Sequence, residues 1–346
     1  MVDVVEKLKN VEGLSMRIRI GSFNIKKFGK KTMTTDRLKN ICEIIDKEHM
    51  DIVSFQEVFS GERALNNLRF LLNGWEYCFA DPTRTSNYTS DKDERGEGYA
   101  FAWNAKKLKP VEYNTEHGTR VFYPRIVNGK DDNDGLNVKC NDIRDMARIP
   151  MYGRFVPIHQ SGFEIRLINI HIAFGGSQEL TATNRRRREY DILVDHIYPT
   201  VRSKRFGNFK PSYTIALGDY NLNLKKPDGV EEDVYRNPLI KGRTRVVDDQ
   251  IIMTVQDKLT SISTAENGDD NGRYSQNYDH FTYCVNEIEM QGNRCVYNRV
   301  DAVEKYHEKD FDAYFTEVSD HVPIILDLYI GEEEPRYDNN GYRKTS

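Results

Sequence analysis

The sequence predicts an α/β protein in which strands and helices alternate along the chain. Short runs rich in β-branched and aromatic residues are typical of strands, and segments with apolar residues at the helical period lie between them. Hydrophobic residues make up 38% and charged residues 30% of the 346 residues, so the chain can bury a core and remain soluble. It contains no internal repeat and no dividing linker. We therefore expect one domain over residues 17–330, an N-terminal extension over 1–16 and a disordered tail over 331–346.

Two strands and one helix are expected near the N-terminus. Residues 17–23 alternate polar and apolar side chains, which predicts a half-buried strand that ends at Asn24. Residues 51–55 predict a second strand, which ends at Gln56 and Glu57. Glu57 is suited to a site, although taken alone it fits a solvated strand end equally well. Between the strands, Thr34 or Thr35 caps a helix with apolar residues at the helical period: Leu38, Ile41, Cys42 and Ile45.

Two more strands are expected in the middle of the chain. Residues 99–103 form an apolar run preceded by Glu97, and residues 163–171 form a run that ends at His171. The acidic segment 128–135 between them is typical of a solvated loop. Its carboxylates are also hard ligands for a structural calcium ion, although the spacing is not that of an EF-hand: Asp131, Asp132 and Asp134.

A long helix is expected over about 178–202. Its apolar stripe, extended backwards, places Arg187 and Arg186 near the core face, whereas Arg185 and Arg188 point outward. The basic surplus of this helix is explained either by a solvated face or by a patch that contacts phosphate.

The stretch Leu-Gly-Asp-Tyr-Asn-Leu-Asn at 217–223 follows an apolar strand over 213–217. If the backbone stays extended, Asp219 and Asn221 leave it on the same side. This pair suits a hard cation or a phosphate oxygen, but the same residue types also form ordinary turns.

The C-terminal third contains two further expected strands. The polar residues 225–275 predict a helix and loops, and residues 278–285, which include Asp279, predict a strand. Residues 286–318 are less regular. The last strand, residues 319–330, begins at Asp320 and His321.

Composition excludes several classes of protein. The net charge of −4 argues against a general polyanion binder, so contact with nucleic acid requires a local basic patch. Five scattered cysteines disfavour a zinc site and a complete disulfide framework. The N-terminus has no apolar core of a secretory signal, and no run is long enough to span a membrane. We expect a reduced, cytoplasmic protein that does not bind membranes.

Polar residues of similar chemistry recur at the ends or starts of the expected strands. Carboxylates can hold a divalent ion that neutralises phosphate charge, and a histidine beside a carboxylate can take a proton from water. The set predicts metal-assisted hydrolysis of a phosphoester and comprises Asn24, Glu57, His171, Asp219, Asn221, Asp279, Asp320 and His321.

The order of these motifs resembles that of the endonuclease/exonuclease/phosphatase superfamily, and within it the deoxyribonuclease I family. The motifs are Ser-Phe-Asn24-Ile, Gln-Glu57-Val, Asn-Ile-His171, Gly-Asp219-Tyr-Asn221, Tyr-Asp279 and Ser-Asp320-His321, with Arg148-Ile-Pro between the second and the third. The resemblance covers about 17–330. It implies a DNase I-like four-layer α/β sandwich, in which two mixed β-sheets pack face to face with helices outside and the site lies at one edge.

The resemblance also implies a role for each matching residue. Glu57, Asn24 and Asp320 would bind Mg²⁺, with Mn²⁺ as another candidate ion. Asp279 and His321 would form the pair that activates water, and Glu97 would support His171 at the leaving oxygen, although the sequence leaves open which histidine is the base. The scissile phosphate and its transition state would be contacted by Arg148, Lys26, Asn24, Asp219 and Asn221.

Some positions depart from the family pattern. Phe59 stands where deoxyribonuclease I has an arginine that enters the DNA minor groove, and Lys26 replaces an arginine that contacts phosphate. The cysteine pairs of the secreted enzyme have no counterpart here. Direct reading of the minor groove is therefore in doubt, whereas binding to the DNA backbone remains open through Lys26, Arg148 and the arginine-rich helix.

Three functions are compatible with these features. The first is a Mg²⁺-dependent endonuclease that hydrolyses DNA phosphodiester bonds with little sequence preference. The second is a phosphoesterase for RNA, an inositol phosphate or a phospholipid, and the third is a binding module without activity. Residues 225–275 or the acidic tail are candidates for restraint of the enzyme, alone or through a regulatory protein partner.

Overall fold

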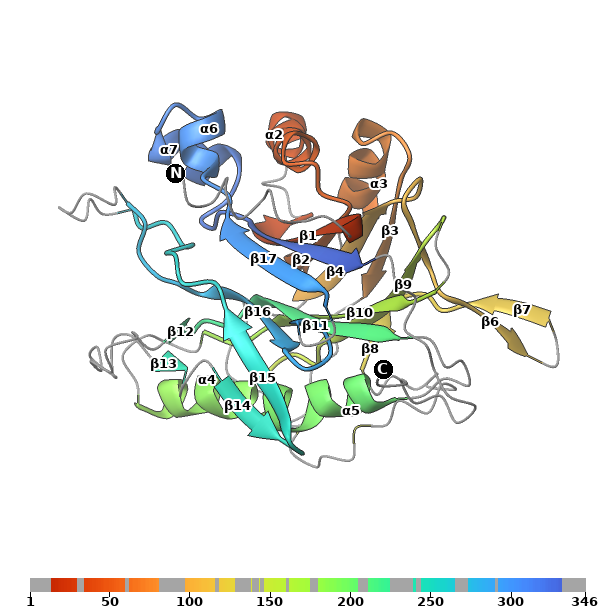
Figure 1. The fold of residues 1–346 in the computed structure, drawn as a ribbon. Helices are drawn as coiled ribbons and strands as arrows, with labels where there is room; N and C mark the ends of the chain where they lie inside the picture. The colour runs from red at the N-terminus through yellow and green to blue at the C-terminus, as the bar shows by residue number, and fades with distance from the viewer. Residues whose placement is uncertain are drawn as a thin grey trace.

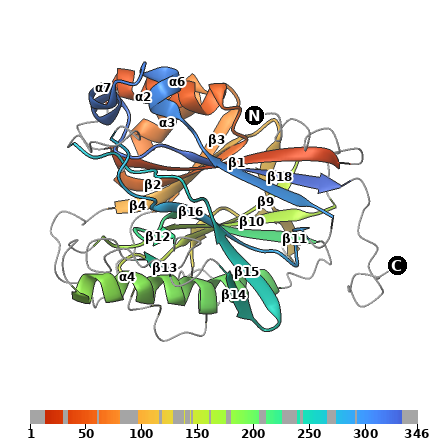
Figure 2. The same cartoon turned by 60° about the vertical axis from the view of Figure 1, so that its left-hand side comes forward.

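Two mixed β-sheets lie face to face, and helices cover the outer face of each sheet, so that the chain forms four layers (Figure 1 and Figure 2). This arrangement confirms the predicted α/β sandwich. The structure is a computed structural model that describes residues 14–29, 34–59, 62–80, 97–115, 118–127, 138, 143, 146–159, 162–174, 180–204, 211–224, 239–240, 244–264, 273–289 and 292–331. The expected extension up to residue 13, the acidic segment with its calcium ligands and the tail from 332 lie outside these residues.

The first sheet has six strands, and all neighbours are antiparallel except β1 and β2, which are parallel. Its strands in spatial order are β17 (Arg294–Arg299), β18 (Ile324–Gly331), β1 (Leu14–Phe28), β2 (Ile52–Phe59), β4 (Glu97–Asn104) and β3 (Trp75–Ala80). Its outer face is covered by α2 (Thr35–Lys47), α3 (Glu62–Leu71), α6 (Ala302–Tyr306) and α7 (Phe311–Glu317) (Figure 1).

The second sheet has eight strands. In spatial order they are β14 (Thr244–Val247), β15 (Gln250–Val255), β16 (Asp279–Cys284), β11 (Ser212–Asp219), β10 (Glu164–His171), β9 (Met151–Pro157) and β5 (Leu108–Pro110), with β8 (Arg125–Ile126) paired to β9. Its outer face is covered by one continuous helical segment, made of α4 (Leu180–Ile192), the π-helical turn η2 (Leu193–Ile197) and α5 (Tyr198–Ser203) (Figure 2).

Two small sheets complete the described elements. One pairs β12 (Asn223–Leu224) with β13 (Leu239–Ile240), and the other is a hairpin of β6 (Glu112–Thr115) and β7 (Gly118–Val121) that stands away from the body in Figure 1.

Three separate apolar clusters hold the four layers together. The first lies between the first sheet and its helices, the second between the second sheet and the α4–α5 segment, and the third between the two sheets. On β1, Phe23 and Ile25 belong to the outer cluster, whereas Ile18 and Ile20 belong to the cluster between the sheets. Because side chains alternate along a strand, the strand is half-buried at its start, where Arg17 is exposed beside the buried Ile18, and is buried on both faces over residues 21–25.

Several local expectations were confirmed, and others were wrong. The Thr34 hydroxyl accepts the Arg37 N–H as the N-cap of α2, as one of the two alternatives predicted. The described part of 225–275 contains the strands β13, β14 and β15 and no helix, because β14 and β15 extend the second sheet beyond β16 and β13 pairs with β12. Asp320 and His321 precede β18 rather than begin it, and His321 forms a single bridge with Ser261. Within the described residues, no helix is long and apolar enough to cross a membrane.

Gly218 is required where β11 approaches β10. Its φ is +149°, and a Cβ added there would lie 1.8 Å from the carbonyl oxygen of Ile170 on the parallel neighbour. A backbone atom cannot move aside as a flexible side chain can. The glycine before Asp219 therefore allows the two strands that carry His171 and Asp219 to pair closely.

We expect Gly218→Ala to lower the free energy of unfolding by more than about 3 kcal/mol, because the new methyl group collides with backbone. Gly292→Ala is the control, since Gly292 also has a positive φ but an added Cβ there meets no atom of the described residues within 4 Å; it should cost only about 1 kcal/mol. Urea unfolding measures both, and equal losses would refute the close-approach explanation.

Candidate active site

The predicted polar residues lie at one end of the sandwich because they continue the side-chain rows that face the space between the sheets. On β11, Ile215 and Leu217 belong to the cluster between the sheets, and Asp219 is the next side chain on that face. On β1, Asn24 is an even number of residues after Ile20, so its side chain leaves the strand on the same inward face. The same spacing places Glu97 before Tyr99 and Phe101, His171 after Ile165 and Leu167, and Asp279 before Phe281 and Tyr283.

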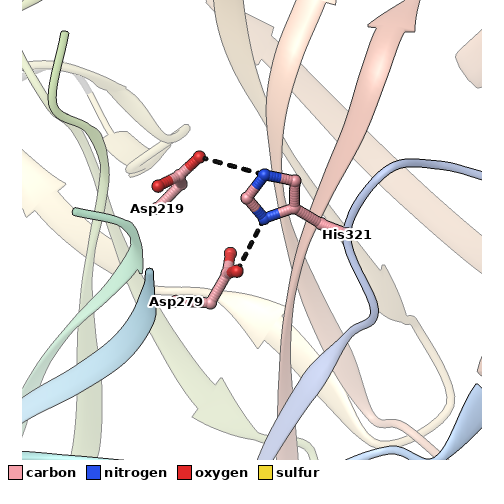
Figure 3. A group of neighbouring side chains, drawn as sticks. All are labelled: Asp219, Asp279 and His321. Carbon is pink, nitrogen blue, oxygen red and sulfur yellow. Dashed lines mark hydrogen bonds and ion pairs between the residues drawn. The ribbon is translucent and has the colours of Figure 1, made fainter. Parts of the chain in front are cut away.

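The first histidine unit pairs His321 with Asp279 (Figure 3). Nδ1 of His321 lies 2.7 Å from Oδ2 of Asp279, and both side chains are buried. Burial alone would lower the pKa of His321, but the carboxylates of Asp279 and Asp219 outweigh it and raise this pKa to about 10. The Nε2 atom of His321 is then the nitrogen that faces the site.

The second histidine unit joins His171, Glu97 and Arg148. Nδ1 of His171 contacts one carboxylate oxygen of Glu97, and Nη2 of Arg148 lies 2.6 Å from the other. Arg148 Nη1 also donates to the carbonyl oxygen of His171 at 3.2 Å. Burial opposes the charge of Glu97, but Arg148 and His171 prevail and lower its pKa. Burial likewise opposes the charge of His171, yet Glu97 and Asp219 raise its pKa to about 9.

Asp219 lies between the two histidines. Its Oδ2 atom is 3.5 Å from Nε2 of His171 and 3.7 Å from Nε2 of His321, and it accepts the amide of Asn24 at 3.0 Å. Its Oδ1 atom accepts the backbone N–H of Asn221 at 2.8 Å. Burial and the nearby Asp279 raise the pKa of Asp219, although both histidines oppose this shift. Both imidazoles therefore face the same carboxylate oxygen.

Asn221 and Glu57 are placed by unusual backbone conformations. Asn221 has a φ of +49°, and its side-chain amide donates to the carbonyl of Ile172 at 2.7 Å. Glu57 has a φ of +58° and lies where the pairing of β2 shifts register against both neighbours. Such a bulge redirects a side chain. Glu57 accepts the amide of Asn24 at 3.2 Å and the backbone N–H of Lys27 at 3.0 Å.

Lys26 and Asp320 form an ion pair beside this group. The ammonium of Lys26 lies 3.3 Å from Oδ2 of Asp320 and 3.4 Å from the centre of the Phe315 ring. The structure thus places Lys26 next to a predicted metal ligand. Its predicted contact with a substrate phosphate stays a prediction.

The donor set fits a hard divalent cation. Five carboxylates gather here, and burial followed by repulsion from Glu97 raises the pKa of Glu57. Oδ1 of Asp279 is buried and has no hydrogen-bond partner among the described residues. Ligand atoms of Asp219, Asp279 and His321 lie within 4.8 Å of one another (Figure 3), whereas Glu57 and Asp320 are outside that group. Oxygen-rich surroundings with surplus negative charge are what Mg²⁺ and Mn²⁺ prefer.

Further buried polar residues support the candidate site, and the sequence analysis did not predict them. The Gln56 amide donates to Oδ1 of Asn169 at 2.8 Å, and the Asn169 amide donates to the carbonyl of Phe55 at 2.9 Å. The Thr260 hydroxyl accepts the backbone N–H of Asp279 at 3.2 Å. Gln56 and Asn169 each lie in a predicted motif and, by strand alternation, on the side that faces the other sheet. Their position could therefore have predicted a supporting role.

Comparison of the sequence with protein-family models gave no match, and comparison with curated proteins gave none either. Solved structures do match. The endonuclease/exonuclease/phosphatase from Bacteroides vulgatus is 14% identical, with a TM-score of 0.52 over 91% of this chain and 99% of that one. An endonuclease/exonuclease/phosphatase family protein from Bacteroides thetaiotaomicron is 16% identical, with a TM-score of 0.51 over 91% and 98%. A humanized TDP2 from D. rerio is 12% identical, with a TM-score of 0.52 over 91% and 99%.

These similarities show the fold. The chain has the two-sheet α/β sandwich of endonuclease/exonuclease/phosphatase proteins, as the motif order predicted. They do not single out deoxyribonuclease I.

The raised pKa of His171 predicts how stability depends on pH. A histidine with a higher pKa in the folded than in the unfolded chain stabilises the fold fully below its unfolded pKa of about 6.5. This contribution declines as the pH rises and is lost at the folded value of about 9. In chelator-treated protein, the unfolding free energy of the wild type relative to His171→Gln should therefore fall by roughly 3 kcal/mol between pH 6 and pH 9. Urea unfolding at several pH values checks this, and parallel curves would contradict it.

Proposed function

We propose that the protein is a divalent-metal-dependent phosphoesterase. The observation that carries the proposal is the convergence of two carboxylate-backed histidines on Oδ2 of Asp219, at 3.5 and 3.7 Å. Phosphoester hydrolysis needs a group that accepts a proton from water and a group that stabilises or protonates the leaving oxygen. Two imidazoles that face one point, one at the end of β10 and the other just before β18, are suited to these two tasks.

The hydrogen-bond partners of each imidazole suggest which histidine accepts a proton and which assists the leaving oxygen. Asp279 accepts the Nδ1–H of His321, which fixes the tautomer and directs Nε2 toward water once that nitrogen is deprotonated. His171 is held by Glu97, and its Nε2 can donate to the leaving oxygen. Neutralisation of the surrounding carboxylates would lower the pKa of His321, because Asp279 and Asp219 are what raise it.

The residues that would hold the cation are Glu57, Asn24 and Asp320, with Asp219 and Asp279 close by. A bound Mg²⁺ or Mn²⁺ supplies charge neutralisation for the phosphate and for the developing charge of the transition state. Glu57 is oriented for this by Asn24 and by the Lys27 N–H. Arg148, Asn24 and Asn221 each donate to a protein acceptor in this structure, and they would contact the phosphate oxygens by exchanging these hydrogen bonds.

Within this chemistry we propose DNA as the substrate, cleaved internally with little sequence preference. The proposal is supported by the motif order and by two exposed arginines of α4, Arg185 and Arg188, on the predicted basic face. Phe59 is 5% exposed, so its side chain packs in the protein and offers no minor-groove contact. Binding would then depend on the phosphate backbone.

Replacing His321 by glutamine should lower kcat by about 10²–10⁴-fold, because the proton-accepting nitrogen is lost. His307→Gln is the matched control, since His307 is also largely buried and contacts a carboxylate, that of Glu317, away from the site. Its activity should stay near that of the wild type. Supercoiled plasmid with Mg²⁺ tests the DNase activity, and bis-p-nitrophenyl phosphate tests the general phosphodiesterase.

If the wild-type protein hydrolyses the small diester but does not nick the plasmid, DNA is rejected as the substrate and the phosphoesterase activity is kept. An active His321→Gln variant would refute the assignment of the site.

Replacing Glu57 by glutamine should raise the Mg²⁺ concentration for half-maximal activity by at least about tenfold, because an anionic oxygen ligand is removed. Glu112→Gln, at an exposed position on β6, should leave this concentration unchanged. A Mg²⁺ titration of the rate gives the comparison, and identical titrations for both variants would show that Glu57 does not bind the ion.

A further inference from the structure

Helix α4 carries two charged side chains that are completely buried behind the candidate site. Arg186 and Glu189 are each 0% exposed and stand one helical turn apart. Ionised side chains are rarely buried to this extent unless each is paired or hydrogen-bonded. Their partners therefore indicate what the two residues do.

Glu189 binds two backbone segments at once. One oxygen accepts the N–H of Ala147 at 3.1 Å, and the other accepts the N–H of Ala173 at 3.4 Å. Ala147 directly precedes Arg148, and Ala173 lies two residues after His171. A single carboxylate thus connects the segment that carries Arg148 to the segment that follows His171.

Arg186 holds the second of these segments at the next residue. Its Nη1 donates to the carbonyl of Phe174 at 2.7 Å, and its guanidinium lies 5.1 Å from the centre of the Phe174 ring. From the other side, the Asn221 amide donates to the carbonyl of Ile172 at 2.7 Å. The backbone just beyond His171 is therefore fixed at three consecutive residues by three side chains.

The charge on Glu189 is opposed by burial, which raises its pKa to about 7, and is favoured by both N–H groups and by Arg148. An ionised carboxylate can accept both N–H groups, whereas an apolar side chain of the same size would leave both unpaired. The arrangement thus favours a carboxylate at this position.

We infer that Glu189 and Arg186 are positioning residues, which set the separation of Arg148 and His171 and so align the Arg148–Glu97–His171 unit. This inference rests on the proposed function. A displacement of catalytic groups by about 1 Å can lower a rate by about 10²-fold. The helix that covers the second sheet would thus determine the geometry of the site without touching the substrate.

The test compares Glu189→Gln with Glu164→Gln. Glutamine keeps the size of the side chain and one acceptor oxygen, but its NH₂ group faces the other N–H, so one segment is released. Glu164 is a matched control, because it is also buried and charge-paired, with Arg154 and Arg166, but it lies at the opposite end of β10 from His171. Arg186→Lys serves as the second variant, since lysine keeps the charge without the guanidinium geometry.

We expect Glu189→Gln to lower kcat on bis-p-nitrophenyl phosphate by about 10²-fold, with little change in KM. Glu164→Gln should affect stability but keep kcat near that of the wild type. Amide hydrogen exchange at one of the two alanines, Ala147 or Ala173, should become faster in Glu189→Gln, and at neither of them in Glu164→Gln. Arg186→Lys should also lower kcat more than Glu164→Gln does.

Equal losses of kcat in the Glu189 and Glu164 variants, or unchanged exchange at both alanines, would overturn the inference. If the wild-type protein hydrolyses none of the phosphoesters, the proposed function fails instead. The exchange experiment then still decides whether Glu189 holds the two segments.

Discussion

The hydrogen bond between Asn24 and Asp219 is the contact on which the site depends, because it joins the two sheets at the point where the functional groups meet. Asn24 belongs to β1 in the first sheet and Asp219 to β11 in the second. Behind it, Gln56 and Asn169 repeat the link at 2.8 Å. The Asp279–His321 pair crosses between the sheets as well. Each sheet therefore carries part of the candidate site, and the packing of the sheets fixes the distances between the two parts.

Electrostatics explains why so polar a site lies inside a sandwich. Buried carboxylates are unfavourable alone, and here almost every one has a cation or an N–H group beside it. Glu97 is compensated by Arg148 and His171, and Asp219 by two histidines and Asn24. Glu57 accepts the N–H groups of Asn24 and Lys27, while burial and the charge of Glu97 raise its pKa. A cation bound beside Glu57 would compensate this carboxylate.

Much of the fold, and the gathering of most candidate site residues at one place, could be predicted, because polar residues that interrupt apolar runs are visible in a sequence. Asn24, His171 and Asp219 stand at the ends of such runs, and strand parity brings them to one face. The strands in the described part of 225–275 could not be recognised, since they are short, with two to six residues each, and lie within a segment that is polar as a whole. The burial of Glu189 could not be predicted, because it follows four arginines in a helix whose sequence is typical of a solvated face.

The side chains that lead from the core into the candidate site limit which insertions and deletions these strands can accept. A strand turns its side chains to opposite faces at successive residues, so the insertion or loss of one residue between Ile215 and Asp219 would turn the carboxylate toward α4. An insertion or loss of two residues would restore the direction of the Asp219 carboxylate but would shift it along the strand by two residues. The spacing between core and site therefore tolerates substitutions more readily than changes of length, and relatives of this protein should vary in the loops while these strand segments keep a constant number of residues.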